Sequence, residues 1–551
     1  MHLPARQRGL ALLVLLTLFA LAGAYVLVNT LNGGSVALSL ARLDKDRAVL
    51  QDARTALINW ATSEASQPTS GQGFQPGALP CPDINNDGVQ DYSGLVCTGV
   101  LGRLPYKTLG IDDLRDTSGE RLWYGVSSNF VRSTGNVINS DKQGLLTITG
   151  LAPASNVIAV VLAPGARVGN QDRGVAGTNT ASNYLENTNG VANSLNFVTA
   201  KENLTDPVNW FNDLLIVISQ QDLSSSVEPA VAARIQRDIV RQYIYDPTDT
   251  STSTQWSDVA GPNKSRYFDA WGAFPFAAPF ADPGISSYTG TAGTLEGLLP
   301  VVGSLGYNWT LGSGTVVQTG GSGSISSNCA ATTAMDLKCD ITSSGSSSQP
   351  QFRMSGTVAG VGLSFVQLTR LSDVSTSGGV ISSRSLSGSL DNAGAGIVML
   401  DATMPWSDSG TTVTVTINNG NLITSPLISS TDPYAGWYTA NQWHRLTYYA
   451  VSPGYAQGGG GACNAVAPKC LTVDKLPAPY ANPTADTRAV LILAGRSLNG
   501  SARPSASVTD YVEAKNAITA QNIVTGNYAF EHGSSRAVPV TINDRVIVVA
   551  P

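Results

Sequence analysis

The stretch RQRGLALLVLLTLFALAGAYVLVNTL, residues 6–31, decides how the rest of the chain is interpreted. Residues 10–28 carry no charge, and about 20 apolar residues suffice for a helix to cross a bilayer. Two arginines precede the apolar run, and basic flanks stay on the cytoplasmic side. The sequence therefore predicts a single transmembrane helix, with the rest of the chain beyond the membrane.

A second helical pattern follows this run without a break. Residues 35–62, SVALSLARLDKDRAVLQDARTALINWAT, repeat apolar residues at helical spacing. These apolar positions are Leu38, Leu43, Val49, Leu50, Ala53, Leu57 and Trp60. Residues 10–62 are thus predicted to form one helix that is wholly apolar at first and amphipathic afterwards.

Two cleavage sites are compatible with this N-terminus. Signal peptidase could cut after Ala24, within AGA, and release a soluble protein that begins at Tyr25. The apolar run continues past this point into the helical pattern, which is unusual for a secretory peptide. The other site lies between Gly9 and Leu10, where a basic residue and a glycine enter the apolar run.

This N-terminus resembles that of type IV pilins and type II secretion pseudopilins. In both, a basic residue and a glycine precede a helix that is apolar at first and amphipathic afterwards. The resemblance implies that prepilin peptidase cuts after Gly9 and makes Leu10 the mature N-terminus. It also implies a single-pass location in the bacterial inner membrane, with the heads periplasmic. Other pilin or pseudopilin subunits would then bind through the helix and carry the chain into a filament at the cell surface. A plain single-pass anchor is the other interpretation.

Position five of the mature chain departs from the family pattern. Most family members have Glu there, whereas this chain has Val14. The Glu is thought to pair with the N-terminal amine of a neighbouring subunit inside the apolar core, where an unpaired charge is costly. Family members without it are typically minor subunits at the filament tip. The resemblance therefore implies a minor, tip-side subunit of a type IV pilus or secretion pseudopilus.

Composition limits the partners and the compartment. Only 13% of the 551 residues are charged and the net charge is −6, so no basic face is available and nucleic acid is not expected. An even number of locally spaced cysteines beside an apolar N-terminus favours disulfides formed in an oxidising compartment, and free buried thiols are the alternative. The cysteine couples are Cys81 with Cys97, Cys329 with Cys339, and Cys463 with Cys470.

Six phrases recur in the same order in two parts of the chain. They are GALP (77–80) with GAFP (272–275), YSG…GRLP (92–105) with YTG…GLLP (288–300), RLWYGVS (121–127) with RLTYYAVS (445–452), IAVVLAPG (158–165) with AVLILAG (489–495), SNYLE (182–186) with TDYVE (509–513), and WFNDLLIVIS (210–219) with TINDRVIVVAP (541–551). The order predicts a tandem duplication of a pilin-like head, in which an antiparallel sheet packs against a helix. The predicted fold class is therefore α+β.

The second copy is interrupted by a long segment with alternating apolar and polar residues, as in TTVTVTINNG, and with Gly, Ser and Asn between such runs. This pattern predicts an inserted β-sandwich. The predicted domains are a leader peptide (1–9), a transmembrane and assembly helix (10–62), a first head (63–222), a second head (223–300 and 441–551) and the inserted sandwich (301–440).

The segment CPDINNDGVQD, residues 81–91, has the spacing of a calcium-binding loop. Oxygen ligands two residues apart can surround one hard cation, and Gly88 lies where such a loop turns sharply. The predicted Ca²⁺ ligands are Asp83, Asn85, Asp87, the carbonyl of Val89, and Asp91. The twelfth loop position is Gly94 instead of Glu, so bidentate closure is missing. The alternative is a turn whose side chains cap their own backbone.

Catalytic motifs are absent from the sequence, and an enzyme is not expected. GxSxG, HExxH and Walker patterns do not occur, and the histidines (His2, His444 and His532) have no partner at ligand spacing. A periplasmic enzyme on a membrane stalk is the most distant alternative.

An aromatic cluster lies where the insertion rejoins the second head. Its members are Tyr434, Trp437, Tyr438 and Trp443. If exposed, the rings would form a stacking surface for a sugar or a protein, and if buried they would belong to a core. A tip adhesin whose inserted sandwich binds a surface glycan or protein is the nearest functional alternative.

Overall fold

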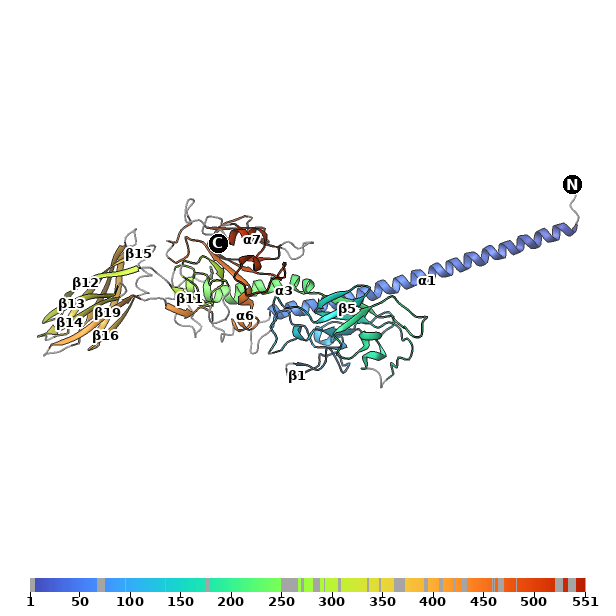
Figure 1. Ribbon diagram of the computed structural model, residues 1–551, viewed down its shortest axis with the longest axis horizontal. Helices are drawn as coiled ribbons and strands as arrows, with labels where there is room; N and C mark the ends of the chain where they lie inside the picture. Colours follow the sequence, from blue (N-terminus) through green and yellow to red (C-terminus); the bar gives the residue numbers. More distant parts are fainter. Residues whose placement is uncertain are drawn as a thin grey trace. The chain divides into compact units, whose positions relative to one another are not determined.

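We describe the protein from a computed structural model (Figure 1). The described residues are 5–66, 75–94, 96–133, 135–174, 179–248, 266–268, 272–280, 288–291, 293–305, 309–333, 336–345, 348–360, 372–390, 395–405, 410–419, 423–428, 434–457, 459, 461–463, 470–481, 483–520, 529–533 and 542–550. The chain divides into two compact units, which are described separately. The first comprises Met1–Ala61, Ala78–Asn136 and Gln143–Leu223, and the second comprises Thr62–Gly77, Val137–Lys142 and Ser224–Pro551.

The first unit begins with helix α1 (Ala5–Ser66), drawn in Figure 1 as one continuous ribbon. Side chains in α1 are described for residues 13–26 and 37–64. Those that pack against the sheets recur every three or four residues, which places them on one face: Leu50, Ala53, Leu57 and Ala61. Arg54 fixes this face further, since it donates to the carbonyl of Val217 at 3.2 Å and pairs with Asp222 at 2.6 Å.

The central sheet of the first unit is antiparallel, in the order β3-β4-β7-β9. Its strands are β3 (Leu101–Arg103), β4 (Trp123–Val126), β7 (Ala159–Ala163) and β9 (Leu214–Ile218). All five residues of β7, AVVLA, are buried, as expected for a β-branched central strand covered on both faces. The hydroxyl of Tyr124 in β4 donates to the carbonyl of Pro80 at 3.1 Å, which fastens the preceding loop to the sheet.

A second sheet in this unit has the order β6-β5-β8, with β5 and β6 antiparallel and β5 and β8 parallel. Its strands are β5 (Leu146–Gly150), β6 (Ala154–Val157) and β8 (Asn196–Thr199). The short elements of the unit are β1 (Tyr92–Ser93), β2 (Val96–Cys97), α2 (Tyr106–Leu109), η1 (Ser128–Phe130), η3 (Ala181–Asn183) and η4 (Asn187–Gly190).

The second unit repeats this arrangement with the same connectivity. Helix α3 (Gln220–Ile235) continues into the π-helical segment η5 (Gln236–Ile244). The central antiparallel sheet consists of β10 (Glu296–Leu298), β21 (Thr447–Val451), β24 (Ala489–Leu493) and β26 (Arg545–Ala550), in that order. As in the first unit, a tyrosine fastens the preceding loop, because the hydroxyl of Tyr449 donates to the carbonyl of Pro275 at 2.9 Å.

The smaller sheet of the second unit also combines one antiparallel pair, β22 with β23, and one parallel pair, β22 with β25. Its strands are β22 (Leu471–Asp474), β23 (Thr484–Thr487) and β25 (Ala529–Glu531). The short helical elements are α6 (Gly436–Ala440), η7 (Trp443–Leu446), η8 (Val508–Asp510) and α7 (Ala514–Ala520).

Between β10 and β21 lie two four-stranded antiparallel sheets, ordered β12-β15-β18-β17 and β13-β14-β19-β16. Their strands are β12 (Trp309–Gly320), β13 (Ser324–Thr333), β14 (Asp336–Ser344), β15 (Gln351–Gly360), β16 (Ser372–Ser377), β17 (Ser382–Leu390), β18 (Ala395–Thr403) and β19 (Thr411–Asn419). The sheets pack closely: a Cβ on Gly314 or Gly356 would lie 2.5 Å from the Leu337 side chain. The strands that precede and follow these eight in the chain, β11 (Val302–Leu305) and β20 (Ile423–Pro426), pair with each other.

The structure corrects the predicted α+β fold class. The described residues form a mixed, strand-rich protein, 33% strand and 25% helix, divided among eight small sheets. The heads were predicted to contain antiparallel sheets, whereas each smaller sheet includes a parallel pair. A four-residue strand such as β8 is too short for its sequence pattern to reveal a parallel partner.

The structure also overturns the predicted transmembrane segment within residues 10–62. Among the residues that it describes, no helix is both long enough and apolar enough to cross a bilayer. The predicted single-pass inner-membrane location depended on that span and is corrected with it.

Candidate functional site

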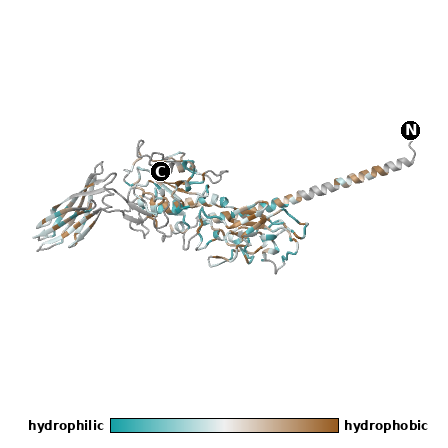
Figure 2. Cartoon of the chain, in the orientation of Figure 1, coloured by the Kyte–Doolittle hydropathy of each residue, from teal (hydrophilic) through white to brown (hydrophobic). Residues whose placement is uncertain are grey.

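The N-terminal part of α1 exposes a dense set of large apolar side chains. Figure 2 colours stretches of this helix brown, the colour of hydrophobic residues. The set comprises Leu13, Val14, Leu15, Leu16, Leu18, Phe19, Leu21, Tyr25 and Val26. Their exposed fractions lie between 49% at Val14 and 71% at Phe19. Because successive helical residues are turned by about 100°, the four adjacent positions 13–16 expose apolar groups on all sides of the helix.

The predicted processing residues lie inside the same helix. Helix α1 begins at Ala5, so Gly9 and Leu10 belong to its second turn, and their side chains lie outside those that the structure describes. Cleavage between them therefore stays a prediction.

The candidate calcium loop is a compact turn stabilised by its own side chains. Asp83 is 1% exposed, and its Oδ1 accepts the backbone N–H groups of Asn86 (2.6 Å) and Asp87 (3.2 Å). Its Oδ2 accepts the N–H of Gly88 at 2.7 Å. Burial raises the pKa of Asp83 even though these hydrogen bonds favour its ionised form. Gly88 has a φ of +89° and packs against the ring of Tyr106, which leaves no room for a side chain there.

The other predicted ligands of this loop also bind backbone groups. Asp91 Oδ2 accepts the N–H groups of Ile84 (2.6 Å) and Asn85 (3.0 Å), and Asp87 Oδ1 accepts that of Val89 (2.7 Å). Within the described part of the chain, no three His, Cys, Asp or Glu residues are grouped as metal ligands. The observed contacts are those of a self-capped turn, and calcium binding stays a prediction.

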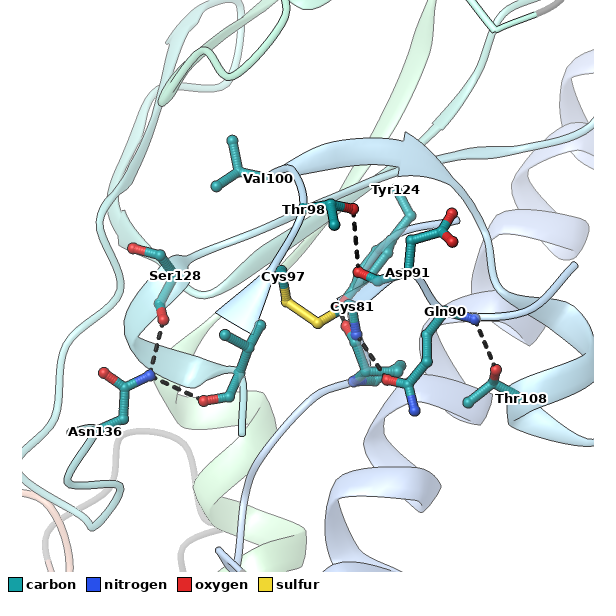
Figure 3. Close-up of a disulfide and its surroundings, with 12 residues drawn as sticks. Cys81, Gln90, Asp91, Cys97, Thr98, Val100, Thr108, Tyr124, Ser128 and Asn136 are labelled. Carbon is teal, nitrogen blue, oxygen red and sulfur yellow. Dashed lines mark hydrogen bonds between the residues drawn. A yellow bond between two sulfur atoms is a disulfide. The ribbon is translucent and has the colours of Figure 1, made fainter. Parts of the chain in front are cut away.

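Three disulfides join the cysteine couples predicted from the sequence. The bonds are Cys81–Cys97, Cys329–Cys339 and Cys463–Cys470. The first closes the candidate calcium loop (Figure 3), where the Cys81 N–H donates to Gln90 Oε1 at 3.1 Å and the Thr98 hydroxyl donates to the carbonyl of Asp91 at 3.3 Å. A covalent link of this kind restricts the loop in the unfolded chain and so favours its folded geometry.

The aromatic cluster at residues 434–443 is mostly core. Trp437, Tyr438 and Trp443 are buried, and Tyr434 is 46% exposed. The guanidinium of Arg234 lies 4.2 Å from the ring centre of Trp437, on the buried side of the cluster. These rings therefore do not form the exposed stacking surface that a glycan would need.

Two histidines are described, and both are enclosed. His444 packs edge-on against the ring of Tyr288 at 5.3 Å, and burial lowers its pKa to about 4. His532 lies beside β26, where it accepts the N–H of Val546 at 3.2 Å, and burial lowers its pKa. Both rings are therefore structural groups of the second unit. His2 lies outside the described residues.

A buried network of carboxyl and amide groups closes one end of the central sheet in the first unit. Glu186 Oε2 accepts the backbone N–H groups of Asn212 (2.9 Å) and Asp213 (3.2 Å). Asp213 Oδ2 accepts the N–H of Glu186 and the Nδ2 of Asn189, both at 2.9 Å. Asn189 also binds the backbone carbonyl and N–H of Val198 at 3.0 and 2.7 Å. The network thus ties η4 to β8 and to the residues that precede β9.

The second unit contains the same network at equivalent positions. Glu513 Oε2 accepts the N–H of Asn543 at 3.2 Å, and Asp544 Oδ2 accepts the N–H of Glu513 at 3.0 Å. Asn516 donates to Asp544 at 2.8 Å and binds both backbone groups of Glu531 in β25 at 2.8 and 2.7 Å. Five of the six contacts described for Glu186, Asn189 and Asp213 therefore have a counterpart.

Burial sets the protonation of both networks. It raises the pKa of Glu186 and, together with the neighbouring Glu186 carboxyl, raises the pKa of Asp213 well above its usual value. In the second unit, burial raises the pKa of Glu513, and burial and the Glu513 carboxyl do the same to Asp544. Two buried neighbouring carboxyls resist ionising together, so each pair favours holding a proton.

An arginine and a glycine extend the correspondence. Arg173 donates to the carbonyl of Gly165 at 2.7 Å, and eight residues likewise separate Gly495 from Arg503, which donates to it at 2.7 Å. Sequence reasoning noted the repeated phrases SNYLE with TDYVE and WFND with TIND, but not the network that they form. The sequence nevertheless held a signal for this network, because the same acidic and amide residues occur at equivalent positions in both copies.

The described residues thus form a strand-rich protein with an exposed apolar helix segment and two similar buried networks. No protein-family model, curated protein or solved structure matches the chain.

Proposed function

We propose that the chain is a minor structural subunit of a filament of the type IV pilus or type II secretion pseudopilus kind. The observation that carries the proposal is the exposed apolar surface of α1 over residues 13–26. Burying one Leu or Phe side chain stabilises an assembly by about 1.5 to 3 kcal/mol. Six Leu and Phe side chains, with three further large apolar ones on the same helix, therefore provide a strong drive toward association with other helices.

The distribution of these side chains specifies the kind of assembly. Residues 13–16 point in four directions around the helix axis, so a single flat partner would leave part of the surface in water. Several helices packed around α1, as in the core of a helical filament, would cover all of it. Val14 adds no carboxylate to such a core, which supports a minor, tip-side position.

Filament incorporation can be tested by placing a charge on this surface. Phe19→Asp would bury an unpaired carboxylate in the helical core and should remove the chain from sheared filament fractions of the producing cell. Val208→Asp is the matched control, because Val208 is 84% exposed and lies outside α1. Equal amounts of both variants in the filament fraction would contradict the proposal.

The mature N-terminus gives an independent test. Mass spectrometry of the protein from the producing cell should find Leu10 as the first residue. A terminus at Tyr25 would remove most of the apolar surface and would rule out this mode of assembly.

A further inference from the structure

The loop that leads from β7 to β8 in the first unit lines part of two cavities. Its described residues, 164–174 and 179–195, contain no strand and only the short helices η3 and η4. Connections this long are uncommon in compact domains and usually carry function. The Glu186 network holds the distal part of this loop against β8, so its conformation is built into the fold.

The first cavity, of about 400 Å³, lies next to the network. The polar side chains of Gln171 and Glu186, which line it, already form hydrogen bonds within the protein. Gln171 Nε2 donates to Glu186 Oε1 at 2.7 Å, and Gln171 Oε1 accepts the N–H of Val168 at 3.1 Å. These polar groups bind one another, which leaves them poorly placed to select a ligand.

The second cavity, of about 360 Å³, has a different chemistry. Three arginines line it, with one carboxylate, two hydroxyl residues and an alanine. The lining residues are Arg42, Arg167, Arg173, Glu120, Thr117, Ser118 and Ala166. Its volume lies within the range of small-molecule sites.

The charge in this cavity is not neutralised. Glu120 pairs with Arg173 at 3.3 Å, and the side chain of Arg173 is 9% exposed and fixed by its bond to the Gly165 carbonyl. Arg42 and Arg167 form no ion pair with any residue that the structure describes. Two guanidinium groups therefore face the cavity without a carboxylate partner.

The walls of the cavity are held in place before any ligand arrives. Asp46, one turn beyond Arg42 on α1, accepts the N–H of Thr117 at 2.6 Å and its hydroxyl at 2.9 Å. Asp116 is buried and joins two walls, because its Oδ1 accepts the N–H of Glu120 at 2.9 Å and its Oδ2 that of Gly165 at 2.8 Å. A site formed in advance loses less entropy on binding.

We infer that this cavity, the arginine pocket, binds a small multiply charged oxyanion bearing phosphate or carboxylate groups. The planar guanidinium fork matches both groups in shape and forms charge-assisted hydrogen bonds with them. Ser118 adds a hydroxyl donor to the lining. The site is independent of the assembly surface at residues 13–26, so either function can fail without the other.

Calorimetric titration of the full chain with inorganic phosphate, and separately with citrate, tests the inference. Saturable binding of at least one anion is expected, and Arg42→Gln with Arg167→Gln should weaken it about tenfold or more. Arg47→Gln is the matched control, because Arg47 is exposed on the same helix and does not line the pocket. It should bind as the unmodified chain does.

Glu120→Gln provides a variant that should gain affinity. It removes the one carboxylate of the pocket and releases Arg173 for the ligand. Glu202→Gln adds the same charge at an exposed position outside the pocket and should have no effect. Equal gains in both variants, or a response that sodium chloride reproduces at equal ionic strength, would mean an adventitious ion only and would overturn the inference.

Discussion

At the scale of single residues, Asp83 holds a turn of the first unit together. Its buried carboxylate accepts three backbone N–H groups. Asp83→Ala should lower the free energy of unfolding by about 2 to 4 kcal/mol, since each buried N–H left without a partner costs about 1 to 3 kcal/mol. Urea denaturation followed by circular dichroism measures this loss.

Asp87→Ala is the control for this substitution. Asp87 is exposed and its side chain accepts one backbone N–H, from Val89, so its removal should cost less than about 1 kcal/mol. The loss in Asp83→Ala should be the same in EDTA as in Ca²⁺, because the bonds it removes are to the backbone. A Ca²⁺-dependent rise in Tm that disappears in Asp87→Ala would instead establish a metal site.

Glu296 makes the second unit sensitive to alkaline pH. Burial raises its pKa to about 8, although the hydroxyl of Tyr448 donates to it at 3.3 Å. Because this folded pKa lies above the ordinary value of 4.5, the stabilising contribution is complete below pH 4.5 and is lost as pH rises from there through about 8. Glu296→Gln cannot ionise, so it should reduce the fall in Tm between pH 5 and pH 9.

The comparison needs an exposed glutamate as reference. Glu202→Gln lies on the surface of the first unit and should leave the pH profile unchanged. A Glu296→Gln variant with the same decrease in Tm as the unmodified chain would show that this carboxyl is already ionised in the folded state at neutral pH.

At the scale of elements, the two buried networks each fasten one short strand. Asn189 and Asn516 are fully buried, and each binds the neighbouring strand through both its carbonyl oxygen and its amide group. Asn189→Ala should therefore loosen β8, and Asn516→Ala should loosen β25, at a cost of about 2 to 4 kcal/mol each. Hydrogen exchange read by mass spectrometry locates the effect.

Each substitution serves as the control for the other. Faster exchange at residues 196–199 in Asn189→Ala, with 529–531 unchanged, and the reverse in Asn516→Ala, is the expected pattern. Equal loosening of both strands by either variant would contradict two self-contained networks.

Some of these elements could be predicted from the sequence and others could not. The cysteine couples were readable because each closes a short local loop, and strands were predictable at NVIAVVLA (156–163) and DRVIVV (544–549) because these runs are rich in β-branched residues. The bond from Asn189 to Asp213 joins residues 24 positions apart, and no local period reports such a contact. The burial of Trp437 could not be predicted from the sequence either, because an aromatic residue is equally compatible with a core and with an exposed binding face.

At the scale of the whole chain, a repeated fold accommodates a large insertion between two adjacent strands of its sheet. In the first unit, β3 and β4 are adjacent in the sheet and separated by 19 residues in sequence; their counterparts β10 and β21 are also adjacent. The two four-stranded sheets lie between β10 and β21 in the chain. The insertion leaves and returns side by side, since Leu305 pairs with Ile423 and Val302 with Pro426.

This geometry predicts that the insertion can be removed cleanly. Replacing residues 306–422 with Asn-Gly would join the paired residues Leu305 and Ile423 by a two-residue turn, the loop length that antiparallel pairs prefer. The shortened chain should keep the β10-β21-β24-β26 sheet, because no strand of that sheet lies in the deleted segment. Exchange protection at β24 should match that of the full chain.

A register control makes the outcome decisive. Joining Ser304 to Ile423 through the same Asn-Gly turn shifts the pairing by one residue and would turn the side chains of one strand to the opposite face. This variant should lose protection at β11 and β20, whereas the in-register variant should retain it. If both variants unfold the second unit, the inserted sheets are needed for its stability, and the pairing of β11 with β20 is a consequence of their folding instead of the frame that supports it.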